Sequence, residues 1–165
     1  SSVTGVQTCA LPIYKIIPTS GVPTNGGGGV IQVVSASTTT DFSTNSTSYV
    51  DITGCTVNIT PKFSTSKIYV TMQGGRFGMY SNASYYSNVQ LVRDSTVLTY
   101  GQPSDRGSNS NGNACGQGAL SFLDSPATTS QITYKAQVKS SSSSGTVYPT
   151  NSGTGLTIVA MEISA

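Results

Sequence analysis

The sequence has no histidine and few charged residues, and both absences narrow the functions open to it. Without histidine the chain cannot form a Ser–His–Asp or Cys–His catalytic group, and a structural zinc site is not expected. Only 8% of the 165 residues are charged, against roughly 25% in ordinary soluble domains. Solubility must therefore come from Ser, Thr, Asn and Gly, as on the surfaces of extracellular and virion proteins.

Clustered positive charge and long apolar runs are also missing. The 8 Lys and Arg residues are scattered and the net charge is only +2, whereas nucleic-acid binding calls for basic residues gathered on one face. No apolar run approaches the roughly 20 residues needed to span a bilayer. We therefore expect neither a nucleic-acid partner nor insertion into a membrane.

Acidic residues are too few and too scattered for hydrolysis of polysaccharide, which needs two facing carboxylates. Asp51, Asp94 and Asp124 are expected at strand ends or turns, where Asp usually bonds backbone amides. Glu162, near the end of the chain, is expected to pair with a Lys or Arg or with a neighbouring subunit. We therefore expect no enzyme, no catalytic residues, no metal and no cofactor.

Three cysteines are present, Cys9, Cys55 and Cys115. Cys55 alternates with Val57 and Ile59, which places its thiol on the face expected to be buried. Two alternatives stay open for Cys55 and Cys115. They form one disulfide, or they are two separate buried thiols that act as small hydrophobic side chains.

What the sequence does contain is a succession of short, alternating, β-branched segments separated by Gly, Ser, Asn and Pro. No segment shows a helical stripe, and the last one is apolar on both faces, as in a central strand. This pattern predicts an all-β protein, an antiparallel β-sandwich of jelly-roll type. Strands are expected at residues 30–37, 48–54, 55–60, 66–74, 87–94, 95–101, 118–124, 131–139 and 155–164. The expected core includes Val70, Leu91, Phe122, Tyr134 and Ile158.

The first residues differ in character from the rest. Residues 3–13, VTGVQTCALPI, resemble the translation of a common sequencing adapter, and they lack the basic region and apolar stretch of a signal peptide. We expect residues 1–13 to be a non-native segment of a chain assembled from environmental DNA, with the natural N-terminus missing. Residues 14–29 are expected to form a Pro/Gly-rich linker and residues 30–165 the β-sandwich domain.

Several motifs resemble the C-terminal β-domains of tailed-phage tail-fibre or minor virion proteins. They are GVIQVVSASTTT, SYVDITG, FLDSPATTS followed by YK, and the final AMEI, and the likeness covers about residues 29–165. The resemblance implies a jelly-roll sandwich in the virion that forms a trimer and is joined to other virion proteins through its N-terminal side. It supplies no catalytic residues, and residues 80–88 and 101–118 depart from it.

Those two departing segments are the candidate ligand-binding loops. Tyrosines among Ser and Asn suit adaptable recognition, because the ring gives rigid contact area and the hydroxyl hydrogen-bonds. Such loops would suit a bacterial surface glycan. The alternative is that the tyrosines pack on the end of the sandwich or against another protomer. The candidate residues are Tyr80, Asn82, Tyr85, Tyr86, Asp105 and Arg106.

The last predicted strand has a second apolar face. If Leu156, Ile158 and Ala160 face the core, then Val159, Met161 and Ile163 face outward, and soluble proteins rarely leave such a stripe uncovered. We expect these three residues to lie in the interface of a homo-oligomer, a trimer. The function expected is a non-enzymatic fibre or decoration domain of a virion. The first alternative is a secreted bacterial adhesin or matrix module. The second is a polysaccharide depolymerase, against which the small number of scattered acidic residues argues.

Overall fold

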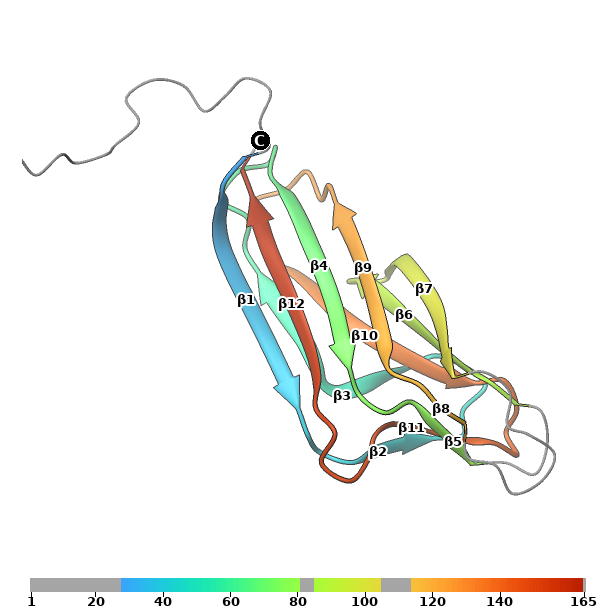
Figure 1. Ribbon diagram of the computed structural model, residues 1–165. Helices are drawn as coiled ribbons and strands as arrows, with labels where there is room; N and C mark the ends of the chain where they lie inside the picture. Colours follow the sequence, from blue (N-terminus) through green and yellow to red (C-terminus); the bar gives the residue numbers. More distant parts are fainter. Residues whose placement is uncertain (1–27, 81–84, 105–113, 165) are drawn as a thin grey trace, which may run out of the picture.

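A computed structural model describes residues 28–80, 85–104 and 114–164 of the chain. Within these ranges the secondary structure consists of β-strands, with no helix. No helix among the described residues is long and apolar enough to cross a membrane. The strands form two large antiparallel sheets and a smaller third one (Figure 1).

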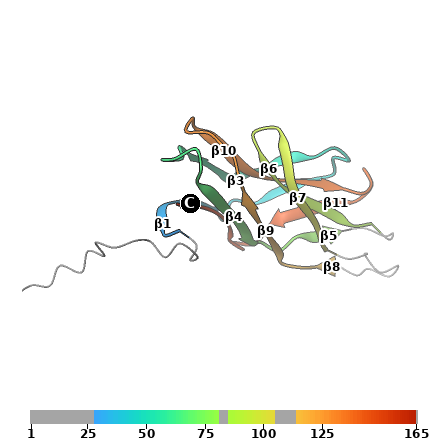
Figure 2. The ribbon, with the colours of Figure 1, turned by 90° about the horizontal axis from the view of Figure 1, so that it is seen from above.

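The first large sheet has the order β1-β12-β4-β9 and the second the order β3-β10-β6-β7 (Figures 1 and 2). The first consists of β1 (Val30–Thr38), β12 (Leu156–Ile163), β4 (Lys67–Gly74) and β9 (Gly118–Asp124). The second consists of β3 (Val50–Ile59), β10 (Ile132–Ser140), β6 (Ser87–Arg93) and β7 (Thr96–Ser104).

This strand order is that of a jelly roll. Along the chain, each connection between consecutive long strands passes from one sheet to the other, except the hairpin between β6 and β7. The final strand, β12, lies between β1 and β4, so first and last strands are neighbours. Two interlocked Greek keys with this arrangement define the jelly roll. The predicted fold class and the central position of the last strand are therefore confirmed.

The third sheet closes one end of the sandwich, and the sequence patterns did not predict it. Its order is β2-β11-β5-β8. Each strand lies within a connection between long strands, so four connections at one end contribute one short strand each (Figure 1). The strands are β2 (Phe42–Thr44), β11 (Thr146–Thr150), β5 (Gly78–Tyr80) and β8 (Ala114–Cys115).

The hydrophobic core lies between the two large sheets. Alternation in β10 buries Ile132, Tyr134, Ala136 and Val138, as predicted. Of the expected core residues, Val70, Leu91, Tyr134 and Ile158 are fully buried. Phe122 is only half-buried. The prediction was wrong in degree there, because Phe122 lies on β9, an edge strand with a neighbour on one side only.

The two strands expected at residues 48–54 and 55–60 are one continuous strand, β3. Gly54 keeps the strand continuous, because its φ of +78° takes up an irregularity that few other residues tolerate. A Cβ at this position would also lie 2.7 Å from the Thr38 Cβ. The pairing register of β10 with β3 shifts between Lys135 and Gln137, opposite this point.

Candidate functional site

The described segments next to the two predicted loops lie at the end of the sandwich that carries the third sheet. Asn82, Asp105 and Arg106 lie outside the described residues, and Tyr80 is described only as the last backbone position of β5. The segments that flank the two loops are brought together by strand pairing, since Met79 pairs with Ala114. Strand pairing therefore brings a described flank of one loop beside a described flank of the other.

Tyr85 and Tyr86 have different environments. Tyr85 is half-buried and packs against the hydrophobic core, and a Cβ on Gly145 would lie 2.7 Å from its ring. Tyr86 keeps 38% of its surface exposed. Its backbone is fixed by Ser141, whose Oγ accepts from the Tyr86 N–H and whose N–H donates to the Tyr86 carbonyl, both at 2.9 Å. Tyr85 is therefore a packing residue, and Tyr86 is the described loop tyrosine open to a ligand.

The predicted interface residues lie on the outward face of the first sheet. Val159, Met161 and Ile163 alternate with buried residues along β12 and are half-exposed. Strand register places Met161 between Val33 and Tyr69, and Tyr69 beside Leu123, so one apolar row crosses all four strands. We call the whole group the outer patch. It consists of Val30, Ile31, Val33, Tyr69, Leu123, Val159, Met161 and Ile163.

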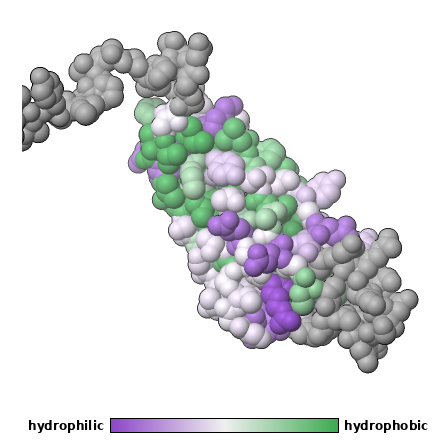
Figure 3. All heavy atoms as spheres, viewed as in Figure 1, coloured by the Kyte–Doolittle hydropathy of each residue, from purple (hydrophilic) through white to green (hydrophobic). Residues whose placement is uncertain are grey.

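The apolar side chains of the outer patch are unusually exposed to solvent. Val30, Val33 and Leu123 each keep more than half of their surface exposed, at 55%, 56% and 54%. The hydrophobic residues gather on the half of this face nearest the start of β1 and the end of β12 (Figure 3). At its margin Lys67 pairs in register with Ile163 and donates to the Ser125 hydroxyl at 2.7 Å. Toward the other end of this face the outward side chains are polar, and the hydroxyls of Ser37 and Thr157 are hydrogen-bonded to each other.

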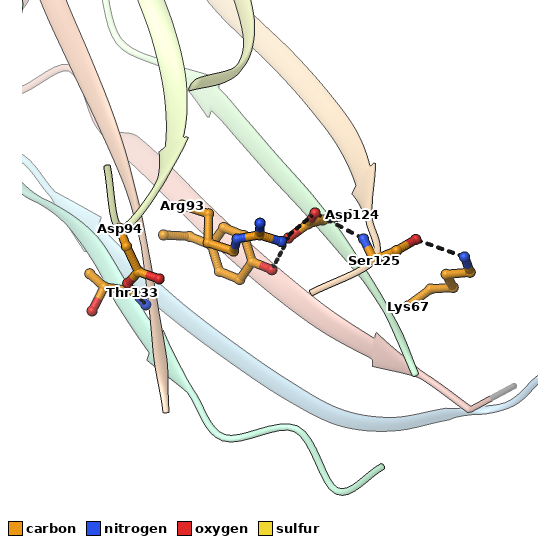
Figure 4. A network of polar contacts seen from close by, with 7 residues as sticks. Lys67, Arg93, Asp94, Asp124, Ser125 and Thr133 are labelled. Carbon is orange, nitrogen blue, oxygen red and sulfur yellow. Dashed lines mark hydrogen bonds and ion pairs between the residues drawn. The ribbon is translucent and has the colours of Figure 1, made fainter. Parts of the chain in front are cut away.

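A buried polar cluster joins the two sheets at the end of the sandwich where β9 ends (Figure 4). Arg93 of β6 donates through Nη1 to both oxygens of Asp124, at 2.8 and 2.7 Å. The Tyr134 hydroxyl donates to Asp124 Oδ2 at 2.6 Å, and the Ser125 N–H donates to Oδ1 at 2.8 Å. Burial, and next the hydrogen bond to Asp124, raise the pKa of Tyr134 far above its usual value. This tyrosine therefore stays protonated and serves as a donor within the fold.

Asp94 and Glu162 also bind backbone N–H groups. Asp94 accepts from the Thr133 N–H at 3.0 Å, as expected for Asp in a turn. Glu162 is completely buried, and its Oε1 accepts from the Lys62 N–H at 2.6 Å. The expected Lys, Arg or neighbouring-subunit partner of Glu162 was wrong, because β12 turns this side chain inward toward the connection between β3 and β4.

The two described cysteines are free thiols. Cys55 is fully buried, as predicted, and burial raises the pKa of its thiol to about 12. Cys115 is exposed on the short strand β8. Neither alternative therefore holds in full, because the two thiols are not bridged and only Cys55 is buried. Among the described residues no three His, Cys, Asp or Glu side chains gather closely enough to hold a metal ion.

A shallow groove of about 180 Å³ lies between the edge strands β7 and β9. Gly101, Pro103 and Leu120 are among its lining residues. Its volume is below the roughly 300–1,000 Å³ of typical small-molecule sites. The groove is therefore smaller than a typical small-molecule site.

No protein-family model matches the sequence, and no curated protein matches it either. Structure comparison finds the T13 particle of infectious bursal disease virus at TM-score 0.39 and 10% identity, covering 89% of this chain and 39% of that one. The VP2 subviral particle of that virus matches at TM-score 0.38 and 14% identity, with 89% and 45% covered.

The insecticidal delta-endotoxin Cry8Ea1 from Bacillus thuringiensis matches at TM-score 0.34 and 15% identity, with 75% of this chain and 19% of that one covered. The chain thus spans less than half the length of each of these three structures. Because the identities and TM-scores are this low, the fold assignment comes from the chain's own strand order. That order makes the described part of the chain a jelly roll, and apolar residues gather on one half of the outward face of its first sheet.

Proposed function

We propose that this chain is a non-enzymatic structural protein of a virus particle, a fibre or decoration domain that assembles with copies of itself. Three features support the proposal. The motifs resemble phage virion β-domains, the fold is the jelly roll that viral capsid proteins also use, and the surface is built from uncharged Ser, Thr and Asn rather than from charges.

The outer patch is the observation that carries the proposal. A monomer would leave a continuous apolar row across four strands in water, which soluble proteins rarely do away from a binding site. A second copy buries this row without any change in the fold. We propose a homotrimer, the state that the resemblance to tail-fibre domains implies.

The two ends of the sandwich then have different roles. The chain enters β1 beside the outer patch, so other virion proteins would attach on that side, through the linker expected at residues 14–29. The third sheet and the loop end lie at the opposite end (Figure 1). In this proposal the opposite end is free to meet a host surface, including its glycans.

Self-association is tested with a charge placed in the outer patch. Met161→Lys or Val159→Lys should shift the protein from trimer to monomer in light scattering at micromolar concentration, because an ammonium group cannot be buried unpaired in an apolar interface. Thr157→Lys is the matched control, on the same strand and face but at its polar end. Lys135→Ala, on the other sheet, should also leave the trimer intact. A wild-type protein that is monomeric at these concentrations would contradict the proposal.

A further inference from the structure

The outward face of the second sheet carries a line of polar side chains flanked by two tyrosines. Strand register places Asp51, Gln137, Gln90 and Tyr100 in one row across β3, β10, β6 and β7. We call the group the tyrosine-flanked strip. It consists of Tyr49, Asp51, Gln90, Tyr100, Lys135, Gln137 and Lys139.

Hydrogen bonds hold the polar members of the strip in fixed positions. Asp51 accepts from Lys135 Nζ at 2.9 Å through Oδ2 and from Gln137 Nε2 at 2.6 Å through Oδ1. Gln137 Oε1 in turn accepts from Gln90 Nε2 at 2.7 Å. Because these amides and the carboxylate are already ordered, a ligand that uses them loses less side-chain entropy on binding.

The two tyrosines bracket this polar line. Tyr100 is 75% exposed, the most exposed of the large hydrophobic side chains described. Lys139 Nζ lies 4.8 Å above the centre of the Tyr49 ring. Burial is the main cause of the raised pKa of Tyr49, and the negative charge that Tyr100 would carry adds to it.

The chemistry of the strip fits a sugar chain. A pyranose ring presents an apolar C–H face, which an exposed aromatic ring can cover, and a rim of hydroxyls that both donate and accept hydrogen bonds. Amide, carboxylate, ammonium and phenol groups together offer both donors and acceptors for such a rim. The strip holds two Lys and one Asp, too little positive charge for a nucleic-acid backbone, and too little apolar area for a hydrophobic peptide.

We propose that the tyrosine-flanked strip binds a carbohydrate chain, with Tyr100 as the stacking platform and Gln137 and Asp51 as hydroxyl-binding groups. Gln90 is buried and holds Gln137 in place through its hydrogen bond. This inference rests on the glycan-binding part of the proposed function, and it places that binding on a sheet rather than on the loops. The strip and the outer patch lie on opposite sheets of the sandwich. A self-associated protein therefore keeps its strips accessible to sugar.

The test uses the full chain on an array of purified bacterial surface polysaccharides, with the apparent Kd measured for those bound. Tyr100→Ala and Gln137→Ala should each weaken binding at least about tenfold, and Tyr100→Phe should retain most of it because the ring remains. Asn58→Ala is the matched control, since Asn58 lies on the same face, outside the strip, and accepts from the Thr133 hydroxyl at 2.7 Å. Binding should persist in 0.5 M NaCl, a salt concentration that would weaken charge-driven binding.

The outcomes separate the strip from the loops. Normal binding by Tyr100→Ala and Gln137→Ala together with loss of binding in Tyr86→Ala would overturn the strip and leave glycan binding to the loop end. No binding of wild-type protein to any polysaccharide on the array would overturn both the strip and the glycan-binding part of the proposed function. Loss of binding in Asn58→Ala or in high salt would also contradict the assignment. Unchanged melting temperatures of the variants establish that they are folded.

Discussion

At the scale of single residues, Asp124 links the two sheets through hydrogen bonds. Its carboxylate receives hydrogen bonds from β6, from β10 and from the backbone N–H that follows β9 (Figure 4). The Asp124 side chain is 7% exposed and that of Arg93 is 23% exposed. A carboxylate buried to this degree is stabilised only while its partners stay in place.

Replacing Asp124 with Ala should therefore destabilise the protein by about 3 kcal/mol or more, since it leaves Arg93 without its counter-charge and the Tyr134 hydroxyl without its acceptor. Tyr134→Phe, which removes one hydrogen bond to a charged group, should cost less, about 1.5–3 kcal/mol. Urea denaturation monitored by fluorescence measures both. Lys67→Ala, at the solvent-exposed end of the same network, serves as the control and should change stability little. Equal losses for Asp124→Ala and Lys67→Ala would contradict this view.

Asp51 gives the protein a dependence on acid that can be measured. Burial raises the pKa of Asp51, but hydrogen bonds from Gln137 and Lys135 and the charge of Lys135 outweigh it, so the pKa lies below the ordinary value of 3.8. Its charged form therefore stabilises the fold above pH 3.8, and this contribution is lost as the pH falls through the lower pKa of the folded state.

The stability difference between wild type and Asp51→Asn should accordingly be constant from pH 7 to pH 5 and shrink toward pH 2. Denaturation curves at each pH give this difference. Asp41→Asn, a change at an exposed carboxylate just before β2, controls for net charge. A difference between wild type and Asp51→Asn that grows on acidification would contradict the assigned sign.

At the scale of elements, β12 supports both the core and the outer patch. Its inward residues Leu156, Ile158 and Ala160 are fully buried, and it is paired on both sides along its whole length. An edge strand such as β9 has one paired side, and its inward Phe122 keeps part of its surface exposed. The position of a strand within the sheet therefore decides how deeply its inward side chains are buried in the core.

Ile158→Ala should cost about 2–5 kcal/mol, as expected for a fully buried aliphatic side chain, and Ile158→Val about 0.5–1.5 kcal/mol. Both are measured by urea denaturation. The difference between the two reports the packing around this side chain. A loss below 1 kcal/mol for Ile158→Ala would show that the centre of β12 is less well packed than its burial indicates.

The large sheets could be predicted from sequence because their strands carry their own signal. From Ile132 to Lys139 in β10, residues of one parity are apolar and those of the other are polar, and every apolar one is buried. The third sheet could not be predicted, because strands such as β8 have two residues and β11 contains Pro149. Such strands form because four connections that are distant in sequence pair with one another, and local sequence patterns do not predict this pairing.

The site was predictable only in part for the same reason. The outward direction of Met161 follows from alternation within one strand, and the structure places it there. The line from Asp51 through Gln137 to Tyr100 depends on the register of three strand pairs, which the sequence does not state. Tyr85 illustrates the opposite case, because its sequence context is that of a binding loop but its ring packs on the core.

At the scale of the whole molecule, the two large sheets expose contrasting faces. The outer patch of the first sheet is apolar and suits self-association, and the second sheet presents the ordered polar strip with its two tyrosines. The third sheet ties the connections at one end to one another. The sandwich thereby presents three distinct surfaces.

The pairing of β1 with β12 also determines how the domain resists mechanical force. Val30 lies opposite Ile163, so the start of β1 and the end of β12 are at the same end of the sandwich. Force that separates these two ends opens the hydrogen bonds of the pair one after another, as in a zipper. Force on β1 that is opposed at the third sheet instead pulls along the strand and loads all those bonds together. A domain tethered through β1 and gripped at its far end is therefore pulled in its stronger direction.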